Sequence, residues 1–290
     1  PPKGRVARSN RAEGTNYFKG KLMVSLKRNS KLELVEAKGK RTRASSIYTP
    51  GQSGDFKVSR GKFSTFITCP RCFYLDRVKG LAEPGMPGWT LNETTDLLLK
   101  KEFDECRIHQ KPHRLFAQYN LEHIVPFEHP SMNDWRDSMR KGLISRYEDS
   151  NIILSGGIDD IWFDTKTEEL IVVDYKSQAN NNPVETQSYL SSPYHDAYKI
   201  QMDFYNYLLE LMGFPIGDTS YFLVVNADRG ALGFHGKMDF EETIVPYQHD
   251  TSWIDEQVQL MIECLNSDEI PGSHISCENC AYARQRSVFE

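Results

Sequence analysis

Two strand-like segments near the middle of the chain, joined by a short polar turn, constrain the fold most. They are predicted at residues 152–163 and 170–176, with the turn at 164–168. Because side chains alternate between the two faces of a strand, Asp174 and Lys176 share one face of the second segment. An otherwise apolar strand therefore ends in a carboxylate and an ammonium that lie side by side.

The first strand of this hairpin carries a further acid, Asp159, at the end of a Gly-Gly-Ile-Asp run. Hairpin pairing can bring Asp159 close to Asp174, and two carboxylates can share a hard cation such as Mg²⁺. A bound divalent ion polarises a phosphodiester and lowers the pKa of a bound water, while Lys176 can orient that water or neutralise developing charge. The alternative is a polar turn beside a solvated ion pair, which needs no metal.

An amphipathic pattern predicts a helix over residues 196–212, which Gly213 ends. Gln201 and Tyr205 stand four positions apart, so they lie on one face of this helix. On their own they would be ordinary surface and packing residues. Their position downstream of a Gly-x-x-Asp and an Asp-x-Lys favours a functional interpretation.

Taken in order, these motifs resemble those of the RecB-type branch of the PD-(D/E)XK nucleases. The run ending at Asp159 is similar to the branch's Gly-x-x-Asp motif, residues 174–176 to its Asp-Tyr-Lys, and residues 201–205 to its Gln-x-x-x-Tyr. The resemblance implies an α/β (α+β) fold with a restriction-endonuclease-like core, a central mixed β-sheet flanked by helices. The catalytic residues that it implies are Asp159, Asp174, Lys176, Gln201 and Tyr205.

The resemblance also implies a catalytic Mg²⁺ or Mn²⁺ ion. The branch has a histidine ligand on an upstream helix, and Asp96 matches its position in this sequence. A carboxylate can ligate either ion, and the backbone carbonyl of Tyr175 would add another oxygen. Glu93 and Glu102 compete with Asp96, and a plain surface helix is the alternative without a ligand. The implied metal ligands are Asp96, Asp159, Asp174 and Tyr175.

Four of the six cysteines form two Cys-x-x-Cys pairs, Cys69 with Cys72 and Cys277 with Cys280. Such spacing in a cytosolic protein indicates metal ligation, and a four-thiolate site would staple the N- and C-terminal parts of the nuclease core together. Four thiolates suit both tetrahedral Zn²⁺ and an iron-sulfur cluster. The placement resembles the staple of AddB-type helicase-nucleases and CRISPR-associated adaptation nucleases. This resemblance favours a [4Fe-4S] cluster, with Zn²⁺ as the alternative.

Charge divides the chain unevenly. Residues 1–50 hold 13 Lys and Arg against three acids, a charge of +10, which leaves −15 for the remaining residues out of a net −5. A polar, Gly- and Pro-containing stretch at 39–54 predicts a linker. Residues 1–55 are therefore expected to form a basic appendage with a short hairpin at 22–35, and residues 56–290 the nuclease domain with the four-cysteine site. The basic leader suits a polyanion, although solvated basic tails are also common.

The remaining periodicity predicts further elements along the chain. Helices are expected at 59–74 with a break at Pro70, from about residue 92, at 134–146 and at 252–266, and strands at 219–226 and 233–245. No apolar run approaches the roughly 18 residues of a spanning helix, so a cytoplasmic protein without membrane contact is expected.

Together the motifs predict a metal-dependent DNA nuclease, an exonuclease or one directed to single strands or ends. DNA is the expected partner, with a helicase or other DNA-processing protein as a further candidate. The alternative is a non-catalytic DNA-binding or scaffold module in which the metal site serves only structure. A redox or metal sensor is disfavoured because the cysteine site has no spare ligand or adjacent nucleophile.

Overall fold

A computed structural model describes residues 26–85 and 88–290, and the chain divides into two units, Pro1–Gly39 and Lys40–Glu290. In the described part of the first unit, Arg28 and Leu34 form an antiparallel bridge across a turn. Residues 22–25 of the expected hairpin lie outside the described residues.

The stretch at 40–54, expected as a linker, belongs to the second unit. It contains the short 3-10 helix η1 (Ala44–Ser46) and the buried Tyr48, whose ring packs edge-on against Phe56 with 5.1 Å between centroids. The polar composition of this segment predicts a linker, but a single buried aromatic residue is enough to anchor the segment to the core.

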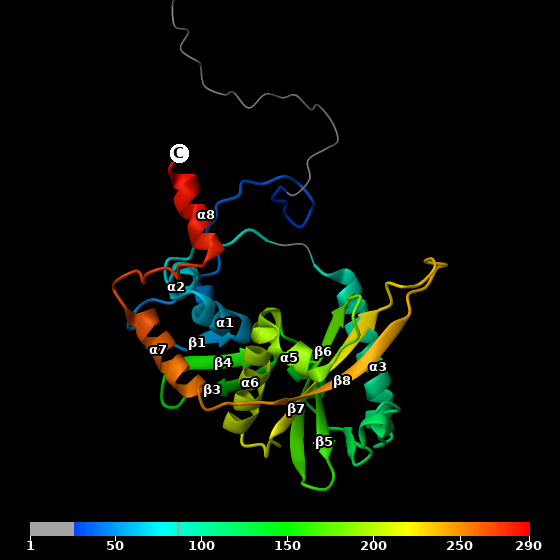
Figure 1. Cartoon of the computed structure of the whole chain (residues 1–290). Helices are drawn as coiled ribbons and strands as arrows, with labels where there is room; N and C mark the ends of the chain where they lie inside the picture. Colours follow the sequence, from blue (N-terminus) through cyan, green and yellow to red (C-terminus); the bar gives the residue numbers. More distant parts are fainter. Residues whose placement is uncertain (1–25, 86–87) are drawn as a thin grey trace, which may run out of the picture. The chain divides into compact units, whose positions relative to one another are not determined.

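Two mixed sheets form the frame of the second unit (Figure 1). In the smaller, β4 (Ile152–Gly156) lies between β1 (Phe56–Ser59), which is parallel to it, and β3 (Leu143–Arg146), which is antiparallel. The larger has the order β2-β5-β6-β7-β8, and β6 and β7 run parallel. Its strands are β2 (Ile124–Pro126), β5 (Asp160–Asp164), β6 (Glu169–Gln178), β7 (Thr219–Ala227) and β8 (Phe240–Gln248).

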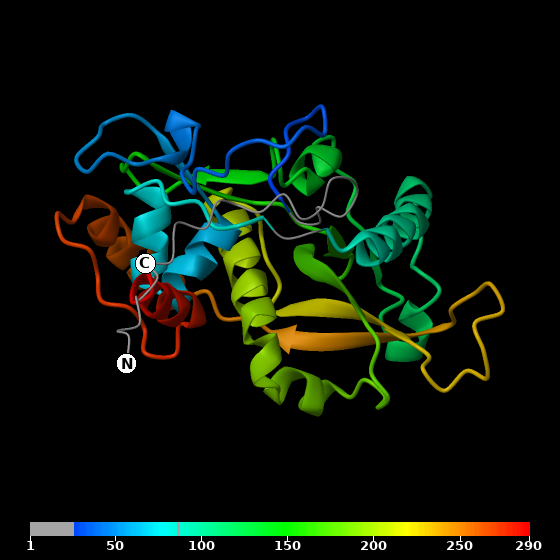
Figure 2. The ribbon, with the colours of Figure 1, turned by 90° about the horizontal axis from the view of Figure 1, so that it is seen from above.

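Helices flank both faces of the larger sheet, so the predicted fold class is confirmed. On one face α3 (Thr90–Ile108) packs its Phe103 in a core with Val173 of β6. On the other, α6 (Asp196–Leu211) shares a core with strands of both sheets, and Figure 2 shows it lying across the middle of the unit. The other helices are α1 (Arg60–Thr68), α2 (Pro70–Arg77), α4 (Met132–Arg136), α5 (Thr186–Ser191), α7 (Ile254–Asn266), α8 (Glu278–Ser287), η2 (Phe116–Tyr119) and η3 (Pro193–His195).

The predicted strand at 152–163 is wrong, because it is two strands in different sheets. The break falls at Gly157, where a Cβ atom would overlap the backbone and Cβ of Ser138. A Cβ atom on Gly156 would likewise overlap the ring of Tyr205. The two glycines let the chain pass between close neighbours and cross from β4 to β5. Apolar periodicity continues across them, so the pattern alone does not reveal the break.

Two other predicted elements also need correction. The helix predicted at 134–146 stops at Arg136, and Gly142, with φ +78°, turns the chain into β3. The strand predicted at 233–245 begins only at Phe240, after a loop with several glycines. By contrast, the break at Pro70 is confirmed, since Cys69 is extended between α1 and α2. Among residues 26–85 and 88–290, no helix is long and apolar enough to cross a membrane.

The crossing at Gly157 can be tested by Gly157→Ala. The added methyl group has to displace the Ser138 backbone, so we expect the free energy of unfolding to fall by about 1–3 kcal/mol. Urea unfolding measures this loss. Gly272→Ala is the control, since a Cβ there meets nothing within 4 Å. Equal stability of the two variants would contradict the assigned role of Gly157.

Candidate active site and cysteine cluster

The end of the β5–β6 hairpin exposes one side of β6. The ladder ends where Asp160 pairs with Val173, and β6 continues to Gln178. Asp159 stands just before β5, and its Oδ2 accepts the backbone N–H of Tyr175 at 3.0 Å. The N–H and C=O of one strand residue point to the same side, so the carbonyl of Tyr175 also points toward the side where Asp159 lies.

Asp174 is fully buried, and both of its carboxylate oxygens have contacts. Oδ2 forms an ion pair with the ammonium of Lys176, and Oδ1 accepts a hydrogen bond from Gln201 Nε2 at 2.6 Å. Gln201 also donates to the hydroxyl of Tyr205 at 3.2 Å, and Lys176 Nζ lies 4.3 Å from the centroid of the Tyr198 ring. The structure therefore brings together five of the predicted residues: Asp159, Asp174, Lys176, Gln201 and Tyr205.

The ionisation of Asp174 responds to this setting. The pKa of its carboxyl is raised to about 7, chiefly by burial and also by the charge of Asp159, against the lowering effect of the Lys176 ammonium. Burial also raises the pKa of Tyr205 to about 12, so its hydroxyl keeps its proton at neutral pH. Without a metal ion beside it, Asp174 is partly protonated near neutral pH even though Lys176 is its ion-pair partner. A metal ion that binds there has to displace the proton.

Asp96 lies near Asp159, but the ammonium of Lys100 stands between the two carboxylates. Lys100 Nζ is 2.8 Å from Asp96 Oδ2 and 3.4 Å from Asp159 Oδ1. Of the competing candidates, Glu102 pairs with Arg114 at 2.8 Å, and Glu93 is exposed near the start of α3. Sequence reasoning missed Lys100, although its spacing of four residues from Asp96 on a helix is a recognisable signal.

A buried ion-pair network lies behind the hairpin and was also missed. Asp160 is fully buried, pairs with Arg107 and Arg136, and accepts a hydrogen bond from the hydroxyl of Tyr175 at 2.7 Å. Arg136 also donates to the backbone carbonyl of Asp159 at 3.0 Å. The neighbouring residues Asp159 and Asp160 therefore differ in role. Asp159 faces the predicted site, and Asp160 belongs to the buried network that supports the hairpin.

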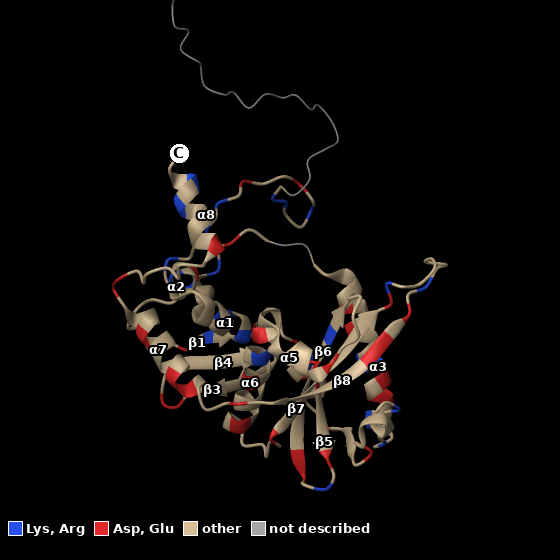
Figure 3. Ribbon diagram, in the orientation of Figure 1, with Lys and Arg blue, Asp and Glu red and all other residues tan. Residues whose placement is uncertain are grey.

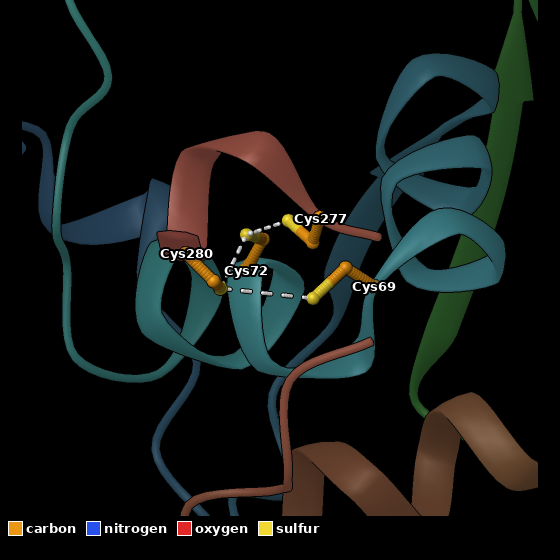
Figure 4. Close-up of side chains that lie close together, drawn as sticks. All are labelled: Cys69, Cys72, Cys277 and Cys280. Carbon is orange, nitrogen blue, oxygen red and sulfur yellow. Dashed lines mark hydrogen bonds between the residues drawn. The ribbon is translucent and has the colours of Figure 1, made fainter. Parts of the chain in front are cut away.

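The four paired cysteines meet where two helices begin (Figure 4). Cys69 and Cys72 belong to the start of α2, and Cys277 and Cys280 to the start of α8. The Sγ–Sγ distances are 3.4 Å for Cys72–Cys280, 3.5 Å for Cys72–Cys277 and 3.9 Å for Cys69–Cys280. All four Sγ atoms lie within 4.8 Å of one another, so this cluster could hold a metal ion.

The surroundings of the cluster favour at least one thiolate. Burial raises the pKa of Cys69, but hydrogen bonds from the backbone N–H groups of Cys72 and His274 and from the neighbouring cysteine side chains together lower the pKa to about 7. Burial and the neighbouring sulfurs raise the pKa of Cys72 instead. One thiolate disfavours the ionisation of the thiols around it, because like charges repel. A bound cation removes this repulsion and stabilises the cluster.

A family model described as the PD-(D/E)XK nuclease superfamily matches residues 87–285, more than half of the chain. The chain belongs to this superfamily. No curated protein matches it. The match covers the hairpin, α6 and the second cysteine pair, whereas Cys69 and Cys72 precede it. Nucleases of the superfamily use divalent metal ions, and residues 174–176 of this chain fit the (D/E)XK pattern of the name.

The donor groups of this member of the PD-(D/E)XK superfamily suit such an ion. The carboxylates of Asp159 and Asp174 and the carbonyl of Tyr175 are hard oxygen donors near the end of β6. Among the described residues, Asp174 Oδ2 is buried and forms no hydrogen bond, and Lys176 is its ion-pair partner. Oxygen atoms without enough positive or N–H partners of their own are the groups that a divalent cation satisfies.

The burial of Asp174 predicts a pH effect on stability without added divalent metal. An unfolded aspartate has a pKa of about 3.9, so between about pH 4 and pH 7 the folded protein keeps a proton that the unfolded chain has lost. This contribution to the free energy of unfolding therefore falls as the pH rises through that window. We expect Asp174→Asn to remove the decline, which urea unfolding between pH 5 and pH 8 measures.

Asp149→Asn is the control for this experiment, since Asp149 is exposed. Its stability should follow the wild-type pH dependence. Parallel curves for Asp174→Asn and the wild type would show that burial of Asp174 is not the cause.

Proposed function

We propose that this protein is a metal-dependent deoxyribonuclease of the RecB-type branch, acting on single-stranded DNA or at DNA ends. The observation that carries the proposal is the meeting of Asp159, Asp174 and Lys176 at one end of β6, with Gln201 from α6 completing the group. A fully buried carboxylate beside a second carboxylate and an ammonium reduces the stability of the fold, which supports a catalytic use of these groups.

Each residue has a distinct role in the proposal. Asp159, Asp174 and the carbonyl of Tyr175 would hold Mg²⁺ or Mn²⁺, which supplies Lewis acidity and lowers the pKa of a bound water. Lys176, held by Asp174 and Gln201, has its ammonium beside the metal-binding carboxylates. There it can orient the attacking water or neutralise charge that develops on the phosphate. Gln201 fixes the rotamer of Asp174, and the hydroxyl of Tyr205 accepts its second N–H.

DNA as the substrate draws support from the distribution of charge. The residues after position 50 carry −15 in total, and Figure 3 shows acidic segments on α3, α7 and β8, with basic ones on α1, β6 and α8. Attraction to a polyanion is therefore assigned to the basic residues among positions 1–50, which we propose hold DNA by phosphate contacts.

The cysteine cluster is proposed as a structural metal site. A tetrahedral Zn²⁺ ion with Zn–S bonds of about 2.3 Å places its sulfurs about 3.8 Å apart. Three of the Sγ–Sγ separations, at 3.4–3.9 Å, fit this geometry, and all of them are within 4.8 Å. A [4Fe-4S] cluster holds each thiolate on a different iron atom and spreads the sulfurs farther. The geometry thus favours the zinc alternative over the cluster that the placement of the cysteines suggests.

A nuclease assay tests the proposed activity. Labelled single-stranded and duplex DNA are incubated with the protein and Mn²⁺ or Mg²⁺. Asp174→Ala and Lys176→Ala should each lower the cleavage rate on the order of 10²-fold or more, since each removes a group that acts in the transition state. Asp149→Ala and Lys166→Ala, which change exposed residues away from this site, should cleave at the wild-type rate.

Two results of the assay would defeat the proposal. One is a wild-type protein that is inert with every divalent metal, and the other is equal activity in all four variants. Salt-dependent DNA binding without cleavage, lost on deletion of residues 1–43, would favour a non-catalytic DNA-binding module.

Metal analysis tests the cysteine site. We expect about one zinc per chain in the freshly purified protein and no visible absorption band. Cys72→Ser should lose the metal and about 2–5 kcal/mol of stability, the range for losing a native cross-link. Cys106→Ser, a buried cysteine outside the cluster, should keep the metal. About four irons per chain with a broad visible band would establish the iron-sulfur cluster instead.

A further inference from the structure

The ammonium of Lys100 occupies a position between two carboxylates at the edge of the candidate active site. It lies 2.8 Å from Asp96 Oδ2 and 3.4 Å from Asp159 Oδ1. The side chain of Lys100 is only 18% exposed, against 33% for Asp96 and 25% for Asp159. A half-buried lysine with two acidic partners is held in place much more firmly than a surface ion pair.

The charges around the site explain why a lysine is needed there. Three carboxylates, Asp96, Asp159 and Asp174, stand at the meeting point of α3, β5 and β6. Lys176 forms an ion pair with Asp174, whereas Lys100 forms ion pairs with both Asp96 and Asp159. Arg136 adds positive charge near Asp96, but its hydrogen bonds go to Asp104, Asp160 and the backbone of Asp159. Lys100 is thus the cation that keeps Asp96 and Asp159 from repelling each other.

An ammonium bridging two carboxylates takes the position that a divalent ion bridging them would take. The two cannot occupy it together, because both need the same oxygen atoms and carry like charge. Asp159 still has its second oxygen toward β6, where Asp174 and the carbonyl of Tyr175 lie. One ion therefore has a place on the β6 side of Asp159, and the α3 side is already filled.

We propose that Lys100 is a positioning residue that takes the place of a second cation and limits the active site to one divalent ion. This inference rests on the proposed function, since it concerns the same site. Asp96 then holds Lys100 and does not ligate the metal directly. Lys100 also leaves one oxygen of Asp159 facing β6, ready for the single ion.

Counting bound Mn²⁺ tests the proposal without any measurement of cleavage. Mn²⁺ is a hard ion that favours carboxylates over the cysteine cluster, and electron paramagnetic resonance of free Mn²⁺ gives the number bound to the full chain. We expect one ion for the wild type and two for Lys100→Met, in which Asp96 and Asp159 are free to share the second. Lys100→Arg retains the positive charge and should bind one.

Two further variants sharpen the count. Lys101→Met, the exposed neighbour on α3, should bind one ion like the wild type. Asp96→Asn combined with Lys100→Met should also return to one, because the carboxylate that accepts the second ion is gone. Lys100→Gln, which keeps hydrogen-bonding capacity, should bind two and replaces Lys100→Met if that variant does not fold.

The results separate this inference from the proposed function. Two ions in the wild type, or one in both neutral variants of Lys100, would overturn the role of Lys100 even in a protein that cleaves DNA. One ion in the wild type and two in Lys100→Met would support it even if no DNA is cleaved, in which case the proposed nuclease activity fails alone.

Discussion

Asp160 carries its charge where water does not reach, and the end of the β5–β6 hairpin depends on how that charge is compensated. Arg107 from α3, Arg136 from α4 and the hydroxyl of Tyr175 from β6 all converge on it. Removing a carboxylate from water costs several kcal/mol, so the network is stable only when every partner is in place. The buried carboxylate therefore fixes the relative positions of α3, α4, β5 and β6. The groups on the opposite side of the hairpin are positioned by the same elements.

The candidate active site uses this rigidity through a chain of contacts. Arg136 fixes the backbone of Asp159, which in turn accepts the N–H of Tyr175. On the other face of β6, Gln201 connects Asp174 to Tyr205, and the absence of a side chain at Gly156 leaves space for the tyrosine ring. Each reactive group is thus held by a partner on a different element, which is how a fold keeps acids of like charge at short range.

Much of this arrangement could be predicted, because it follows from local periodicity. Alternation along a strand places Asp174 and Lys176 together, and helical spacing does the same for Gln201 and Tyr205. Contacts that depend on tertiary approach could not be predicted. The break at Gly157 depends on the nearness of Ser138, and the place of Lys100 depends on how α3 lies relative to Asp159. The sequence identifies each polar side chain, but tertiary packing determines which residue it pairs with.

The two cysteine pairs of the cluster are separated by 205 to 211 positions along the chain. The ribosome therefore synthesises the first pair well before the second. At a synthesis rate of about 5–20 residues per second, Cys69 and Cys72 wait roughly 10–40 s for Cys277 and Cys280. Throughout that interval the first pair is an open dithiol, free to bind a stray metal or to react with an oxidant. Correct assembly of the cluster therefore competes with premature metal binding and oxidation of the first pair. The metal supply and the redox state around the nascent chain decide the outcome.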